Sequence, residues 1–218
     1  IDLVCDEMIP EVSKQGIALF NDVFCEEGYF NLSETRKILN TGIEYGLKPR
    51  MHADEFIDSG AAQLAGEIGV FSADHLMAIS DSGIESLAEN DVIGTLLPGT
   101  TFFLGKNSYA PARRLIDAGI NLALATDFNP GSSNIQSMPF IISLACLFME
   151  MTVEEAYQAA TYNGARSLGL ENEVGSIELG MKADLILWDL NSLIDIPYYI
   201  SNHPIQKVIK NGKIVFGA

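Results

Sequence analysis

The chain has 218 residues, of which 48% are hydrophobic and 19% are charged, a composition typical of a globular protein with one large core. Its 29 acidic and 13 basic side chains give a formal net charge of -16, so no cationic surface is expected that would bind nucleic acid or anionic membranes. No apolar run reaches the roughly 18 residues that predict a membrane span.

Short apolar runs alternate with helical patterns through most of the chain. Five runs are predicted to be strands: residues 21–25, 48–51, 71–73, 92–97 and 122–125. Helical patterns follow them at residues 33–46, 61–69, 84–88, 111–119 and 139–148. Strands that alternate with helices indicate parallel βα units and a parallel sheet.

The first of these helices carries its own start and stop signals. Ser33 is expected to cap its N-terminus, and Gly46 to end it. Ile38, Leu39 and Ile43 recur at helical spacing and are expected on its inner face. The Pro98-Gly99 pair is expected to close the fourth strand.

The pattern changes after residue 150. Residues 152–155 form a capping box that opens a helix through Ala159 and on to Leu168, with Gly169 as its stop. Residues 183–189 and 208–216 are β-like, and Asn211-Gly212 predicts a hairpin within the second stretch. We therefore expect a small β unit outside the parallel sheet.

Chemically active side chains gather where the predicted strands end. Glu26, His52, His75 and Asp127 each follow or end one of the strands. In a (β/α)₈ barrel all strand C-terminal ends face one mouth, where active sites form. A single histidine at a strand end is more often structural, but four such residues on four strands favour a site.

The sequence 52–55, His-Ala-Asp-Glu, is the sharpest signal. A neutral imidazole such as His52 is a good ligand for a divalent metal. Glu55, three residues on, can accept a proton from a metal-bound water and pass it to a leaving nitrogen. Alternatively, Asp54 and Glu55 are acids favoured at the start of a helix by its dipole. The four residues alone do not decide between these readings.

Residues 126–133 form the richest polar stretch. A buried carboxylate without a base, as expected for Asp127, is costly unless it holds a metal or moves a proton. Asn129, Gly131 and Ser132 then offer an amide, an open backbone and a hydroxyl to a polar ligand. A simple turn explains the Asn-Pro-Gly sequence equally well but leaves Asp127 unexplained.

The remaining histidine and the cysteines carry weaker signals. His203 precedes Pro204 in the β-like tail and is expected to be structural or at the surface. Cys25 lies beside Glu26 without a base, so a cysteine mechanism is disfavoured. The three cysteines form no C-x-x-C pair, which favours unbonded thiols and a cytoplasmic protein.

Together these landmarks resemble the amidohydrolase superfamily. Its members bind metal through an H-x-H pair after barrel strand 1, a histidine after strand 5 and an aspartate after strand 8. His52 matches the strand-5 ligand, Asp127 the strand-8 ligand, and His75 the strand-6 histidine that contacts substrate or nucleophilic water. Residues 179–185 are similar to the stretch with which the superfamily returns to a small β-sandwich.

Within the superfamily, the chain is most similar to the imidazolonepropionases. The similar stretches are residues 22–26, 52–55, 72–76, 96–99 and 126–132. The resemblance implies hydrolysis of 4-imidazolone-5-propanoate, a small-molecule substrate, to N-formimidoyl-L-glutamate in histidine degradation. It also implies one divalent metal ion, zinc or iron, and a homo-oligomer such as a dimer.

The resemblance assigns roles to individual residues. His52 and Asp127 would bind the metal, and Glu55, His75 and Asp127 would be catalytic, with His75 hydrogen-bonding the oxyanion or the nucleophile. The residues that would bind substrate are Glu55, Asn129, Gly131 and Ser132.

The resemblance also implies a fold and a limit. The expected fold is α/β, a partial (β/α)₈ TIM barrel with about strands 4–8 in residues 1–170, and part of a composite β-sandwich domain in residues 171–218. The sequence contains no H-x-H pair and no counterpart of strands 1–3. It is therefore expected to be a fragment of a longer protein, inactive by itself.

Three alternatives stay open. A cytosine-deaminase-like or guanine-deaminase-like amidohydrolase uses the same H-x-x-E arrangement. The chain can instead be an inactive half-barrel that acts as an interaction module, because open strand edges invite pairing with another segment. A short paralogue that has lost catalysis is the third.

Overall fold

The computed structural model describes residues 1–202 and 204–217, so the expectation for His203 lies outside the described residues. The chain divides into two compact units. The first comprises Ile1–Leu96 and Arg114–Asn121, and the second comprises Leu97–Arg113 and Leu122–Ala218. Each unit is described separately below.

Five strands, within the described residues, form a sheet whose order follows the chain. They are β1 (Phe20–Cys25), β2 (Lys48–Ala53), β3 (Ser72–His75), β4 (Ile93–Leu96) and β5 (Leu122–Leu124). Strands β1 to β4 pair in parallel, as the alternation of strands and helices predicted. The mixed α/β fold and the five strands are thus confirmed.

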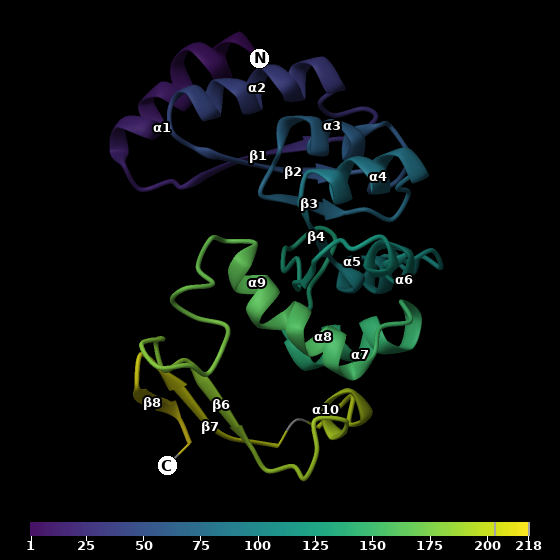
Figure 1. Ribbon diagram of the computed structural model, residues 1–218, viewed down its shortest axis with the longest axis vertical. Coiled ribbons are helices and arrows are strands. Elements are labelled where there is room, and N and C mark those ends of the chain that lie inside the picture. Colours follow the sequence, from purple (N-terminus) through teal and green to yellow (C-terminus); the bar gives the residue numbers. More distant parts are fainter. Residues whose placement is uncertain (203, 218) are drawn as a thin grey trace. The chain divides into compact units, whose positions relative to one another are not determined.

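The helices of the first unit are η1 (Val4–Met8), α1 (Ile9–Gln15), α2 (Leu32–Glu44), α3 (Ala61–Ile68) and α4 (Asp81–Glu89), and α6 (Ala112–Asp117) follows later in the chain. Of these, α2 packs on β1 and β2, and α3 packs on β2 and β3. Figure 1 shows α2 running alongside β1, against which it packs. Leu39 and Met51 are completely buried in this layer. The sequence patterns gave no prediction for η1 and α1.

Alternation along β2 divides its side chains between two faces. Met51 and Ala53 are fully buried, whereas Arg50 and His52 are half-buried. Successive side chains of a strand point to opposite faces. His52 therefore lies on the face opposite the one that carries Met51 and Ala53.

Two sequence expectations for α2 were wrong. Asn31, not Ser33, is the N-cap: its side chain accepts hydrogen bonds from the backbone N–H groups of Ser33 and Glu34, and the Glu34 carboxylate accepts one from the Asn31 N–H. An Asn with extended backbone two residues earlier satisfies two N–H groups at once, which leaves Ser33 inside the first turn. Ile43 is 44% exposed because the buried face of α2 follows Thr35, Ile38, Leu39 and Gly42, so Gly42 rather than Ile43 lies against β1 in the last turn.

The second unit contains further helices and a small sheet. Its helices are α5 (Pro98–Phe103), α7 (Met138–Phe148), α8 (Val153–Ala160), α9 (Tyr162–Arg166) and α10 (Asp195–Tyr198). Pro98 and Gly99 open α5 rather than merely closing β4, because proline is well suited to the first turn of a helix. Thr152 and Glu155 form the predicted capping box of α8.

The helix predicted to run on to Leu168 is interrupted at Thr161. This residue adopts φ -124° and ψ -91°, and α9 begins after it. The Thr161 hydroxyl donates to the carbonyl of Tyr157, a bond that commonly bends helices. Buried Asn163 then donates to the carbonyl of Leu122 at 2.8 Å, which attaches α9 to β5. A tertiary hydrogen bond therefore overrides the helical sequence pattern.

The C-terminal β unit is antiparallel. It consists of β6 (Leu185–Trp188), β7 (Ile205–Lys210) and β8 (Lys213–Phe216), which pair in the order β6-β7-β8. Asn211 and Gly212 both have positive φ, 49° and 74°, as the predicted two-residue hairpin requires. In the part of the chain that the structure describes, no helix has the length and apolar character needed to cross a membrane.

The cap of α2 can be tested by two neighbouring substitutions. Asn31→Ala should lower the free energy of unfolding by about 1 kcal/mol, because two N–H groups lose their acceptor. Ser33→Ala should cost only roughly 0.5 kcal/mol or less, because Ser33 accepts no bond from the helix backbone in the described contacts. Urea unfolding measures both. Equal losses would show that Asn31 is not the principal cap.

Candidate active site

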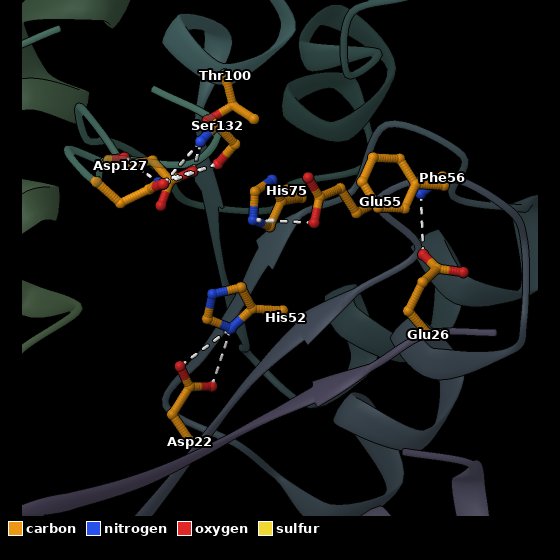
Figure 2. A network of polar contacts seen from close by, with 10 residues as sticks. Asp22, Glu26, His52, Glu55, Phe56, His75, Thr100, Asp127 and Ser132 are labelled. Atoms are coloured by element: carbon orange, nitrogen blue, oxygen red, sulfur yellow. Dashed lines mark hydrogen bonds and ion pairs between the residues drawn. The ribbon is translucent and has the colours of Figure 1, made fainter. Parts of the chain in front are cut away.

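The ends of β1, β2 and β3 bring four predicted site residues into the same part of the first unit (Figure 2). Parallel pairing sets Phe24 beside His52, and His52 beside Asp74. The imidazole rings of His52 and His75 lie 5.2 Å apart, centre to centre. Glu26 directly follows β1, and Glu55 lies two residues beyond β2.

His52 contacts a carboxylate that the sequence analysis did not single out. Its Nδ1 lies 3.0 Å from an oxygen of Asp22. Ligand atoms of Asp22, His52 and Asp74 all lie within 4.8 Å of one another, a grouping able to hold a metal ion. These acids could be found from the sequence only by pairing strands in register, because both occupy strand interiors.

Asp74 is held by basic and hydroxyl partners. Its carboxylate lies 3.2 Å from the Arg50 guanidinium and accepts a hydrogen bond from Ser72. Burial raises the pKa of Asp74, while Arg50 and Ser72 favour its charged form. Ser72 also contacts Thr95, so the polar network extends to β4.

His75 is buried in an unusual backbone conformation. It is 3% exposed, and its φ is 76°, in the left-handed region that non-glycine residues rarely adopt. Burial, and secondarily the neighbouring His52, lowers the pKa of His75 to about 3. The ring is therefore neutral near pH 7, with one N–H donor and one acceptor nitrogen. Its Nε2 lies 3.6 Å from the Glu55 carboxylate, and Figure 2 shows the two side chains pointing toward each other.

The two acids after His52 have different environments. Asp54 is fully buried, and its carboxylate accepts from the backbone N–H groups of Ser59, Ala61 and Ala62. Burial raises the pKa of Asp54, although these bonds oppose the shift. Asp54 therefore serves the start of α3, as the helix-terminus reading proposed, whereas Glu55 is directed at His75.

The second unit holds the other predicted site residues in one loop after β5. Asp127 has a φ of 50°, and its carboxylate accepts a hydrogen bond of 2.5 Å from Thr100. The Asn129 side chain accepts from the N–H groups of Gly131 and Ser132, both at 2.8 Å, and donates to the Asp127 carbonyl at 2.7 Å. Asn129 thus closes its own turn, and Thr100 is a partner of Asp127 that sequence reasoning missed.

Cys25, the last residue of β1, is buried. Its side chain is 1% exposed, and burial raises the pKa of its thiol. A protonated, inaccessible thiol is a poor nucleophile. This environment disfavours Cys25 as a nucleophile.

Comparison with known proteins identifies the family. Residues 42–215 match the model of the amidohydrolase family. The chain belongs to this family. The match spans β2 to β8, and so includes the ends of β2 and β3 and the loop after β5.

Curated relatives are named imidazolonepropionase. The Geobacillus kaustophilus (strain HTA426) protein is 53% identical over 215 residues, covering 99% of this chain and 50% of that protein. The Alkaliphilus oremlandii (strain OhILAs) protein is 44% identical, covering 99% of this chain and 51% of its own length. The amidohydrolase chain therefore spans about half the length of the curated relatives it matches.

Solved structures share the fold. An adenosine deaminase from Xanthomonas campestris with bound zinc superposes with a TM-score of 0.80 at 22% identity, covering 96% of this chain and 55% of that one. A 5-methylcytosine deaminase from Klebsiella pneumoniae gives 0.76 at 18% identity, covering 97% and 59%. At these identities, the likeness establishes the α/β arrangement of an amidohydrolase and no particular substrate.

The lowered pKa of His75 predicts acid-sensitive stability. Because its folded pKa of about 3 lies below the ordinary value of 6.5, the unfolded chain binds a proton that the folded chain does not between these pH values. Stability from this group is full above pH 6.5 and decreases as the pH falls. Metal-free protein should lose about 2 kcal/mol more than its His75→Gln variant between pH 7 and pH 5, as measured by urea unfolding. Parallel losses in both proteins would contradict a neutral, buried His75.

Proposed function

We propose that the full product of this gene is a metal-dependent hydrolase that opens the ring of 4-imidazolone-5-propanoate to give N-formimidoyl-L-glutamate, a step of histidine degradation in the cytoplasm. The observation that carries this proposal is 53% identity to an imidazolonepropionase across 99% of the chain. The pairing of His75 with Glu55 beside His52 supports a hydrolytic site.

The residues present fit a divalent metal ion. An imidazole with oxygen donors nearby is a donor set that suits zinc or iron. We propose His52 and Asp127 as ligands, because they are the pair that the resemblance to the amidohydrolase family implies, and because Arg50 and Ser72 already engage Asp74. Asp22 then orients the His52 ring by pairing with its Nδ1 atom. Carboxylates commonly accept a hydrogen bond from the second ring nitrogen of a metal-binding histidine. The bound zinc of the Xanthomonas campestris deaminase favours zinc.

When bound, the metal would lower the pKa of a water molecule and polarise the lactam carbonyl. Glu55 accepts the proton that the attacking water loses and delivers it to the ring nitrogen as the carbon–nitrogen bond breaks. His75, held neutral by burial, donates its N–H to the developing oxyanion or to the attacking water. Asp127 would contribute to catalysis as a ligand of the metal ion. The Thr100 hydroxyl holds its carboxylate by a hydrogen bond.

The loop closed by Asn129 is proposed to bind the polar part of the substrate. Its internal hydrogen bonds set the backbone of Gly131 and the hydroxyl of Ser132 before substrate arrives. A preset loop pays less ordering entropy on binding. Asn129 thus shapes the loop, and its side chain is also proposed to contact the substrate.

We also propose the domain organisation. Residues 1–170 would form the C-terminal part of a (β/α)₈ barrel, and residues 171–218 part of a composite β-sandwich. Apolar side chains of the small sheet support the second assignment, since Ile186, Ile214 and Phe216 are each about half exposed, at 49%, 54% and 58%. Such side chains suit a sheet that is completed by further strands. Assembly as a homo-oligomer, such as a dimer, is part of the same proposal.

Substitution of Glu55 tests the proposed reaction. Glu55→Gln should lower kcat for 4-imidazolone-5-propanoate by at least about 100-fold, because the proton carrier is lost, with metal content unchanged. Glu27→Gln, an exposed neighbour, is the control and should keep its activity. Cytosine and guanine are assayed alongside. Undiminished turnover in the Glu55 variant would refute the proton-transfer role, and preferential deamination of either base would refute the substrate.

The metal ligands are tested by elemental analysis. His52→Ala and Asp127→Ala should each reduce the content from about one metal ion per chain to well below half of that, and chelation should abolish turnover. His203→Ala is the histidine control and should retain metal. If both ligand variants kept full metal content, the proposed ligand pair would be wrong.

A further inference from the structure

A buried carboxylate outside the proposed chemistry contacts the backbone beside Glu55. Glu26 follows β1 and is 4% exposed. One of its carboxylate oxygens accepts a hydrogen bond of 2.9 Å from the Phe56 N–H, and the other accepts one of 3.1 Å from the Glu27 N–H. Figure 2 shows the carboxylate directed at the Phe56 backbone, on the side of Glu55 away from His75.

We infer that Glu26 is a positioning residue for Glu55, which it holds toward His75 through the Phe56 peptide. This inference rests on the proposed function, in which Glu55 carries the proton. Burying a carboxylate costs free energy unless hydrogen bonds compensate. Both oxygens of Glu26 obtain backbone N–H donors, so the loop after β1 is tied to the loop after β2.

The peptide link makes this tether specific to Glu55. The Phe56 nitrogen shares a planar peptide unit with the Glu55 carbonyl. Fixing the direction of the Phe56 N–H therefore fixes the plane that follows the Glu55 Cα. The ring centroids of Phe24 and Phe56 lie 6.4 Å apart, and this aromatic contact also links the chain around β1 to the loop after β2.

The chain before Glu55 is anchored independently. The Asp54 carboxylate binds the first N–H groups of α3, and its carbonyl accepts from the Ala78 N–H at 2.8 Å. Glu55 thus lies between two anchored residues, Asp54 and Phe56. Removing the Glu26 carboxylate would release only the second anchor. The fold around Asp54 and α3 would persist while the Glu55 side chain became less well placed.

Three variants of the full gene product separate this role from a purely structural one. They are Glu26→Ala, which removes both acceptors, Glu26→Gln, which keeps an amide oxygen for the Phe56 N–H, and Glu27→Ala, an exposed neighbour whose N–H is retained. For each variant, kcat per bound metal ion, metal content and hydrogen exchange of the Phe56 amide are measured.

Glu26→Ala should lower kcat by roughly 10- to 100-fold, as expected for a misplaced catalytic group, with metal content unchanged and faster exchange at Phe56. Glu26→Gln should recover activity to within roughly fivefold of the unaltered protein because it keeps the acceptor, and Glu27→Ala should match the unaltered protein. Unchanged kcat in Glu26→Ala, or a loss of activity that follows a loss of metal, would overturn the inference. An equal loss of kcat in Glu26→Gln and Glu26→Ala would also overturn the inference.

The readouts separate this inference from the proposed function. Failure of the unaltered protein to hydrolyse 4-imidazolone-5-propanoate would refute the proposed function. The exchange rate of the Phe56 amide reports on the tether whatever the substrate is. Unchanged exchange in Glu26→Ala would overturn the tether even in an active enzyme.

Discussion

Parallel pairing of β1, β2 and β3 is the constraint on which the candidate site depends. The register sets Phe24 beside His52 and His52 beside Asp74, so groups separated by more than twenty residues in sequence become neighbours. Because side chains alternate along each strand, the residues that pack against the helices and the polar residues of the site use opposite faces. The apolar positions Met51 and Ala53 thereby fix where His52 can point.

The carboxylates near this site have distinct structural and chemical roles. Asp54 and Glu26 direct their oxygens at backbone N–H groups, and both therefore hold loops. Asp74 is paired with Arg50, and Asp22 with His52. Glu55 alone among the described acids of these strands and loops is directed at His75. This division gives a physical reason why two adjacent acids, Asp54 and Glu55, cannot substitute for one another.

Much of the fold followed from local sequence, because short apolar runs and capping boxes are local signals. The five strands, the capping box at Thr152 and the hairpin at Asn211-Gly212 were all predicted. The break at Thr161 was not, because it depends on a hydrogen bond between Asn163 and Leu122, 41 residues apart. The cap of α2 was misplaced by two residues because Asn31 and Ser33 are both good capping residues.

The candidate site was predicted in part for the same reason. His52, Glu55, His75 and Asp127 were found because each stands at or near the end of an apolar run. Asp22, Thr100 and the tether from Glu26 to Phe56 were missed, since each is defined by a partner elsewhere in the chain. Asn129 illustrates a remaining ambiguity of sequence, because the amide that could bind a ligand closes its own turn.

We propose that His52 and Asp127 bind one metal ion, with Asp22 hydrogen-bonded to the other ring nitrogen of His52. Anomalous diffraction at the metal absorption edge, on crystals of the full gene product, tests this most directly. We expect one peak within about 2.2 Å of a His52 nitrogen and an Asp127 oxygen, with the Asp22 carboxylate hydrogen-bonded to the other ring nitrogen of His52. A peak coordinated by Asp22, His52 and Asp74, with Asp127 uninvolved, would contradict it.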